Sequence, residues 1–350
     1  MSALRHPVVE EDLRAIVAQP LAWDRFGGRT VLVTGASGLV ASYLVETLLF
    51  LNETRRLDIR VVALVRDEQR ARERFAVYDG RPDLRYLVQS AADPLALAGR
   101  ADFIVHAAGH ASPRWFGLDP VGTYAPNVLG THHLLTHAHD HGTESLLFVS
   151  SGAVHGALPA GTTLSERTYG VVDPLDVKSC YAESKRMGET MCASWFVQFG
   201  VPARIARLGH TYGPGMRRDD DRAFADFVFS VVDGRDIVLN SDGLATRMFC
   251  YLSDATVGLL LALLEGRPAE AYLVANGKAA TTIRALAELV TSLYPERGSR
   301  VLVEPAARPA GYLPNTDPAM PLDTSKMRAL GWEPAVGLTE GFRRTIASYL

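Results

Sequence analysis

The sequence predicts an α/β fold in which a doubly wound parallel sheet precedes a smaller C-terminal lobe. Short apolar runs alternate with helical patterns as far as Leu208, and this alternation is typical of parallel sheets. From Tyr212 onward the pattern breaks into glycine and proline turns and shorter elements, which indicates a second, smaller unit. The predicted strands cover residues 30–34, 60–65, 85–89, 103–106, 146–150 and 203–208.

A glycine-bearing turn follows the first predicted strand and precedes a helical pattern, which is the context of a dinucleotide-binding turn. Gly35 permits the tight turn, and Gly38 lets a pyrophosphate approach the N–H groups at the start of the helix. Ala41 is small enough for contact between helix and strand at the third position of the motif. Taken alone, such a turn could also be an ordinary connection from strand to helix.

Three later residues indicate proton and hydride chemistry. Ser151 follows the strand predicted at 146–150, so it lies at the carboxyl edge of the sheet, where ligands bind. Tyr181 and Lys185 are four positions apart and share one face of a helix. A tyrosine, with an ordinary pKa of about 10, acts as a base near neutrality when nearby positive charge lowers that pKa, and Lys185 can supply the charge. Each of these motifs alone is common enough to occur by chance. Their occurrence in this order after the glycine turn predicts an enzyme.

The chain divides into three predicted parts. Residues 1–28 form an N-terminal extension, in which 11–17 has the spacing of a short amphipathic helix. Residues 29–211 form the dinucleotide-binding domain. Residues 212–350 form mostly the smaller lobe, with some segments returning to the first domain. With 350 residues, the chain can bury a substantial core.

Composition argues against several classes of function. The net charge is -3 and the charges are interspersed, so the chain has no basic footprint for nucleic acid. Three scattered cysteines are too few for a disulfide framework, which fits a reducing cytoplasm. No apolar stretch reaches the ~18 residues that a membrane span needs, and the N-terminus lacks the apolar core of a signal peptide. We therefore expect a cytoplasmic protein without nucleic-acid or membrane partners.

These motifs make the chain resemble the extended short-chain dehydrogenase/reductase family, and within it the nucleotide-sugar epimerases, dehydratases and decarboxylases. The resemblance runs from about Arg29 almost to Leu350, and it looks closest to the UDP-glucuronate decarboxylase-like branch. It implies a Rossmann domain with a smaller C-terminal substrate-binding lobe. The matching segments are 34–41, 106–108, 111–113, 127–131, 150–156, 179–181, 207–215, 221–222 and 247–254.

The resemblance implies that bound NAD+ oxidises a hydroxyl of a nucleotide-diphosphate sugar and later returns the hydride. Tyr181 would be the base, Lys185 would hold the nicotinamide ribose, and Ser151 would contact the reacting hydroxyl. A homodimer formed through the helices that contain Asn127 and Tyr181 is the implied assembly. The implied cofactor-binding residues are Gly35, Ser37, Gly38, Leu39, Val40, Arg66, Ala107 and Lys185, and the implied substrate-binding residues are Ser112, Asn127, His155, Arg207, His210 and Arg247.

The chain departs from the family at positions that bear on the reaction and the cofactor. Decarboxylases and many dehydratases carry an acid two residues after the catalytic Ser or Thr, where this chain has Ala153. Gly152 likewise replaces the Asp that is typical of dehydratases. Arg66 follows the second predicted strand, where an NAD-specific member offers a carboxylate, and an arginine can accept the 2′-phosphate of NADP. We therefore expect an epimerase that uses NAD, with NADP left open.

Two histidines and two arginines each allow two interpretations. His155 and His210 replace the family's Tyr and Asn, and they could bind a divalent metal or transfer protons. Their spacing matches no local metal-ligand motif, which favours hydrogen bonding without a metal. Arg207 or Arg247 could hold the diphosphate, or could form internal ion pairs.

Two other functions stay open at this point. A nucleotide-sugar mutase or isomerase, for example one that interconverts pyranose and furanose rings, could work with a divalent metal and without hydride transfer. A non-catalytic nucleotide-binding protein could also keep this fold.

Overall fold

The computed structural model describes residues 5–304 and 320–350, and its centre is a parallel sheet in the strand order β10-β6-β5-β4-β1-β2-β3. Four predicted strands have the predicted bounds, and the other two differ by one residue at each end. The sequence pattern does not predict β10, which joins the edge of the sheet after the chain has passed through the lobe. The strands are β1 (Thr30–Thr34), β2 (Arg60–Val65), β3 (Leu84–Val88), β4 (Phe103–His106), β5 (Ser145–Ser151), β6 (Ala203–Leu208) and β10 (Ala271–Val274).

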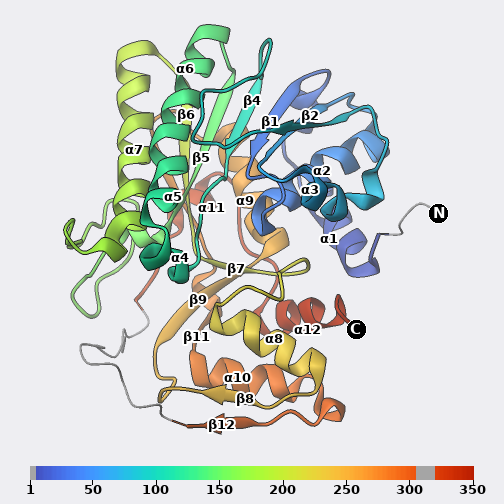
Figure 1. Ribbon diagram of the computed structural model, residues 1–350, viewed down its shortest axis with the longest axis vertical. Helices are drawn as coiled ribbons and strands as arrows, with labels where there is room; N and C mark the ends of the chain where they lie inside the picture. The colour runs from blue at the N-terminus through green and yellow to red at the C-terminus, as the bar shows by residue number, and fades with distance from the viewer. Residues whose placement is uncertain (1–4, 305–319) are drawn as a thin grey trace.

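Helices cover both faces of this sheet (Figure 1). Along β1, Val31 and Val33 face one apolar cluster and Leu32 faces the other, because side chains alternate along a strand. Both faces are therefore buried, and the strands appear in the sequence as continuous apolar runs. One face carries α2 (Leu39–Arg55), α3 (Glu68–Arg74) and α9 (Leu252–Glu265), and the other carries α5 (Pro120–Ala125), α6 (Thr131–His141) and α7 (Cys180–Phe199).

Helix α7 packs very close to β5. Gly188 of this helix faces Phe148 of β5, and a Cβ atom at Gly188 would lie only 2.3 Å from the phenylalanine ring. The glycine thus permits the close approach that brings Tyr181 and Lys185 beside the end of β5.

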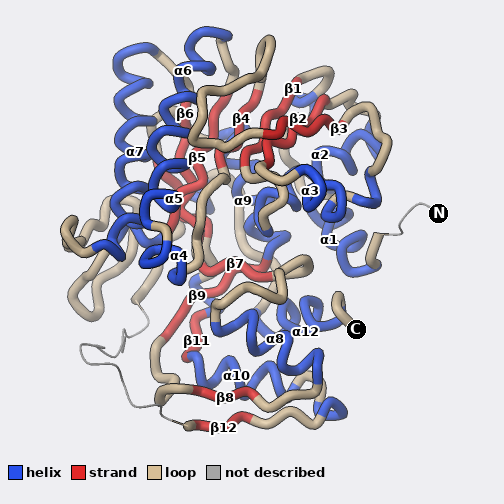
Figure 2. The backbone as a smooth tube through the Cα atoms, viewed as in Figure 1, coloured by secondary structure: helices blue, strands red, loops and turns tan. Residues whose placement is uncertain are grey.

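The smaller lobe begins at the carboxyl edge of the sheet, because β6 leads directly into the lobe strand β7 (Figure 2). Its apolar core is separate from the two clusters beside the main sheet, and in it the rings of Tyr212 and Phe342 stack 4.0 Å apart. The remaining elements are α4 (Pro113–Leu118), β7 (His210–Tyr212), α8 (Ala223–Asp233), β8 (Ile237–Leu239), β9 (Thr246–Tyr251), β11 (Ala280–Thr282), α10 (Ile283–Ser292), β12 (Val301–Val303), α11 (Ser325–Ala329) and α12 (Leu338–Ala347).

The N-terminal extension connects the two parts through helix α1 (Pro7–Val17), which begins before the predicted residue 11. The carboxylate of Asp12 is buried and accepts hydrogen bonds from the hydroxyls of Tyr43, at 3.0 Å, and Tyr251, at 2.7 Å. It also accepts one from Arg344 of α12, at 2.8 Å. The extension therefore ties α2 of the sheet domain to β9 and α12.

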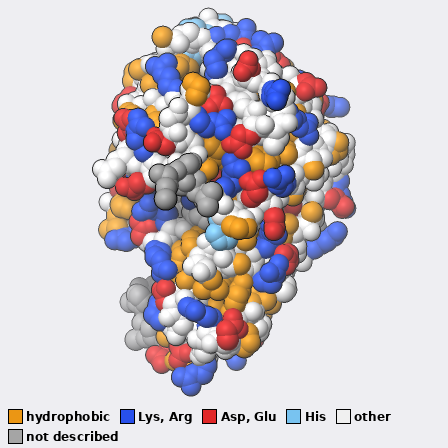
Figure 3. Space-filling view, turned by 90° about the vertical axis from the view of Figure 1, so that its right-hand side faces the viewer, with side chains coloured by type: hydrophobic (Ala, Val, Ile, Leu, Met, Phe, Trp, Pro, Cys, Tyr) orange, Lys and Arg blue, Asp and Glu red, His pale blue; other side chains and the backbone are white. Residues whose placement is uncertain are grey.

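The face of the molecule in Figure 3 mixes basic and acidic side chains. None of the helices within 5–304 and 320–350 is long and apolar enough to cross a membrane.

Candidate active site

The glycine turn between β1 and α2 has the geometry of a close backbone approach. Gly35 has a φ of +64°, and a Cβ atom there would lie 2.7 Å from the Cα of Ala108. Gly38 is exposed at the start of α2, which has no side-chain cap, so the first N–H groups of the helix can receive an anion. The other predicted cofactor residues here, Ser37, Leu39 and Val40, are half-buried around Gly38.

Behind this turn, β1 and β4 are joined by Thr34 and His106, neither of which was predicted to be a site residue. The Thr34 hydroxyl lies 2.7 Å from His106 Nδ1 and accepts hydrogen bonds from the N–H groups of Ala107 and Ala108. His106 Nε2 lies 2.9 Å from the carbonyl of Pro126. Burial, assisted by the charge of Lys185, lowers the pKa of His106 to about 3, so the ring is neutral. This network places the backbone of Ala107 beside Gly35.

Tyr181 lies at the start of α7, and its ring stacks on Phe116 with the ring centres 4.9 Å apart. Burial raises the pKa of Tyr181, while a hydrogen bond with Ser151 and the positive charge of Arg222 act in the opposite direction. This differs from the prediction that Lys185 lowers this pKa, because the opposing charge in this structure belongs to Arg222. The structure does bring Ser151 and Tyr181 together at the end of β5, as predicted.

Lys185 is buried one helical turn beyond Tyr181. Its Nζ donates a hydrogen bond of 2.7 Å to the carbonyl of Val149 and lies 5.8 Å from the centre of the Tyr181 ring. Burial lowers the pKa of Lys185 to about 7, and the nearby carboxylate of Glu189 opposes this. The ammonium therefore titrates in the physiological range.

The lobe contributes Arg222, whose charge acts on Tyr181, and His210, on which the charges of Arg222 and Arg247 both act. Loss of surrounding water, followed by the charges of Arg247 and Arg222, lowers the pKa of His210 to about 4. Because the His210 side chain is exposed, we attribute its lowered pKa mainly to the two guanidinium groups. Arg222 is an addition to the predicted site: its charge acts on both Tyr181 and His210. The sequence pointed to Arg222 only through the resemblance of segment 221–222 to the family.

A hydrogen bond links the loop before α8 to the sheet domain. Ser112, a predicted substrate residue, donates it to Asp221 from the start of α4. The neighbouring acids have other partners, since Asp219 binds Arg217 and Asp220 binds Arg222. Within the described ranges, no three His, Cys, Asp or Glu side chains are grouped to hold a metal.

The guanidinium of Arg207 is fully buried in an internal ion pair with Glu189, so it is not available to hold a diphosphate. Its Nε and a terminal nitrogen donate to the carboxylate of Glu189 at 2.9 and 2.6 Å. Its terminal nitrogens also donate to the hydroxyl of Tyr169 and the carbonyl of Glu166. Of the two interpretations of Arg207, the internal ion pair is therefore correct, and the predicted contact with the substrate is wrong.

Asn127 and His155 are also buried, and each makes a hydrogen bond within the protein. Asn127 is fully buried in a π-helical turn (Pro126–Gly130), and its amide donates a 3.0 Å hydrogen bond to Ser184 of α7. His155 is buried with Nδ1 2.8 Å from the carbonyl of Thr168, and burial lowers its pKa. Both side chains hold turns in place, which corrects their predicted contact with the sugar.

Arg66 is exposed at the end of β2 and forms no ion pair with the residues that the structure describes. Asp67 caps α3 by accepting a hydrogen bond from the N–H of Arg70. The guanidinium of Arg66 is thus the charged group at this strand end that stays available to a cofactor.

Comparison with known proteins identifies related chains. Residues 31–275 match the model of the NAD dependent epimerase/dehydratase family. UDP-glucuronic acid decarboxylase 6 of Arabidopsis thaliana is 33% identical over 314 residues, which cover 89% of this chain and 86% of that protein. The structure of dTDP-glucose 4,6-dehydratase from Streptomyces venezuelae, with NAD bound, is 26% identical with a TM-score of 0.76, covering 91% and 96%. The structure of an epimerase from Methanothermobacter thermautotrophicus shares the fold, with a TM-score of 0.77 and 20% identity. The match covers 98% of this chain and 95% of that one.

Proposed function

Because the chain belongs to the NAD-dependent epimerase/dehydratase family, we propose that it modifies a nucleotide-diphosphate sugar through transient oxidation of a hydroxyl. The observation that carries this proposal is the joint placement of Ser151, Tyr181 and Lys185 at the end of β5. Tyr181 takes the hydroxyl proton, and Ser151 hydrogen-bonds the same oxygen. Lys185 binds the nicotinamide ribose.

The glycine turn fits the pyrophosphate of a dinucleotide, because a Cβ atom at Gly35 would fill the space against Ala108. The N–H groups at the start of α2 bind its phosphates, and Ala107 and Arg66 flank the cofactor at the ends of β4 and β2. NAD, when bound, supplies the hydride acceptor and a positive charge that helps Tyr181 act as a base. The Streptomyces venezuelae structure holds NAD, and we propose the same cofactor here.

Within the family we propose an epimerase. The Arabidopsis thaliana relative is a decarboxylase, but this chain has Ala153 where a decarboxylase has its acid. Ser151 and Arg222 are the groups that oppose the effect of burial on the pKa of Tyr181, and neither is a carboxylate. Removing and returning a hydride needs the base and the cofactor, whereas the family's elimination and decarboxylation routes also use the acid. Arg222 and Arg247, whose charges both act on His210, provide the cationic surroundings that a diphosphate requires.

The test identifies both the cofactor and the product. Denatured protein should release NAD(H), measured by mass spectrometry, and incubation with UDP-, dTDP- and GDP-sugars should give a product of unchanged mass. A product lighter by carbon dioxide or by water would contradict the epimerase and assign a decarboxylase or dehydratase. Chelator-sensitive turnover without NAD would favour the mutase, and binding without turnover would favour the non-catalytic protein.

We also propose a homodimer formed by α5 and α7. Exposed apolar side chains lie on both helices, among them Val121 and Tyr124 on α5 and Met187 and Val197 on α7. A second copy would remove this surface from water. Light scattering should give the mass of a dimer, and Val121→Arg combined with Val197→Asp should give a monomer. The control Leu244→Asp, at another exposed apolar residue, should leave the mass unchanged; a monomeric starting protein would contradict the proposal.

A further inference from the structure

A carboxylate without a predicted role lies on α7, one turn beyond Lys185. Glu189 accepts hydrogen bonds from Ser150 Oγ at 2.6 Å and from two nitrogens of Arg207 at 2.9 and 2.6 Å. The Glu189 side chain is 11% exposed and that of Arg207 is 0% exposed. Through this carboxylate, helix α7 is attached to both β5 and β6.

Two of the elements that Glu189 joins, α7 and β5, carry the proposed catalytic groups. Tyr181, Lys185 and Glu189 follow each other at intervals of four residues, so they share one face of α7. Ser150 stands between Val149, whose carbonyl accepts the Lys185 hydrogen bond, and Ser151, whose side chain acts on the pKa of Tyr181. A shift of Glu189 would therefore move the lysine and the serine relative to each other.

Glu189 also supplies the charge that the buried ammonium needs. Burying an ammonium is costly unless an opposite charge lies nearby. Of the ionisable groups that face Lys185 from the elements packed around it, Tyr181 of α7 and His106 of β4 bring no negative charge. The carboxylate of Glu189 is the group that raises the pKa of Lys185 against the effect of burial.

We propose that Glu189 is a positioning residue that holds the Lys185 ammonium in register with Tyr181 and Ser151. Arg207 and Ser150 keep its carboxylate in place. The consequence for turnover rests on the proposed function. The effect on Lys185 itself does not, so the two can be tested separately.

The first measurement is the titration of Lys185 in the full-length protein. The chain has only four lysines, so protein labelled with 13C at lysine Cε gives four NMR signals, and Lys185→Arg identifies the one that matters. The signal should titrate near pH 7. In Glu189→Gln, which keeps the shape but removes the charge, the midpoint should fall by about one pH unit or more.

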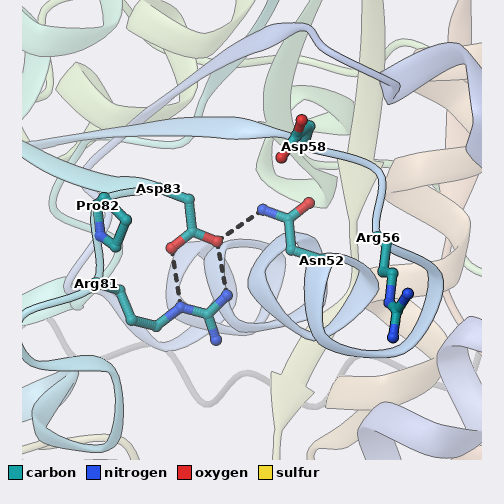
Figure 4. A pocket seen from close by; sticks show the side chains of 6 residues that line it. All are labelled: Asn52, Arg56, Asp58, Arg81, Pro82 and Asp83. Atoms are coloured by element: carbon teal, nitrogen blue, oxygen red, sulfur yellow. Dashed lines mark hydrogen bonds and ion pairs between the residues drawn. The ribbon is translucent and has the colours of Figure 1, made fainter.

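Asp83, drawn with its hydrogen bonds in Figure 4, provides a matched control just before the edge strand β3. Like Glu189, it accepts two hydrogen bonds from one arginine, Arg81, and a third from another side chain, Asn52. Asp83→Asn therefore removes a comparable network far from Lys185. It should lower the melting temperature and leave both the Lys185 midpoint and the turnover unchanged.

A Lys185 midpoint that moves by less than about 0.3 pH unit in Glu189→Gln overturns the proposal. If that variant does not fold, the double variant Glu189→Gln, Arg207→Gln also removes the guanidinium that has lost its carboxylate, and the same fall in the Lys185 midpoint is expected. With an identified sugar substrate, Glu189→Gln should lower kcat by about tenfold or more and change KM by less than about threefold. Unchanged kcat with only a lower melting temperature would show a structural role. Absence of turnover in the unsubstituted protein would contradict the proposed function. The titration of Lys185 would then decide by itself whether Glu189 is a positioning residue.

Discussion

Replacement of Tyr181 by phenylalanine is expected to lower kcat by at least about 10²-fold, the lower end of what a general base contributes. The substitution removes the hydroxyl beside Ser151 and keeps the ring that stacks on Phe116. The fold and the bound dinucleotide should therefore survive. Turnover of the nucleotide sugar and transient NADH absorbance at the nicotinamide band measure the effect.

Tyr294→Phe is the control for the loss of a tyrosine hydroxyl. Tyr294 lies in the lobe and donates one hydrogen bond to the carbonyl of Arg343, away from the site. This variant should keep full activity. Full activity in Tyr181→Phe as well would refute the role of the phenol and favour a site that works without this base.

Gly35→Ala should abolish stable binding of the dinucleotide and lower the stability of the fold. The backbone at Gly35 has a φ of +64°, which costs an L-residue about 1–2 kcal/mol. The new Cβ would also lie 2.7 Å from the Cα of Ala108, so β1 and β4 would have to separate where the pyrophosphate binds. The NAD content after purification and the melting temperature report the two effects.

Gly80→Ala separates backbone strain from the close contact. Gly80 has a φ of +74°, but no atom lies within 4 Å of the position of its missing Cβ. It should lose stability through strain alone and keep its NAD. Equal NAD content in both variants would show that the close approach at Gly35 is not needed for binding.

Local sequence patterns predicted most of the strands of the sheet and the placement of Tyr181 and Lys185 on one helix face. The bounds of β1 and β2 were predicted because both faces of the sheet are buried, which makes each strand a continuous apolar run. The four-residue interval between Tyr181 and Lys185 was sufficient to place both side chains on one helix face. Strand β10 was missed because its short run follows the lobe, and its pairing with β6 depends on contacts far along the chain.

Local sequence patterns could not predict which side chains from distant parts of the chain contact one another. The sequence left Arg207 either as a diphosphate contact or in an internal ion pair, and the packing of β6 against α7 decides for the ion pair with Glu189. Asn127 lies in a family motif, but the π-helical turn directs its amide into α7. Arg222 was missed because its charge reaches Tyr181 only through the position of the lobe.

The sequence by itself determined the periodicities, the glycine turn and the order of Ser151, Tyr181 and Lys185, because these depend on neighbouring residues and on the repeat of each element. The tertiary structure alone decided which charges are buried together and which groups set the pKa values of Tyr181 and Lys185. Such pairing depends on which distant elements pack together and on how much water that packing removes, and one-dimensional spacing carries neither.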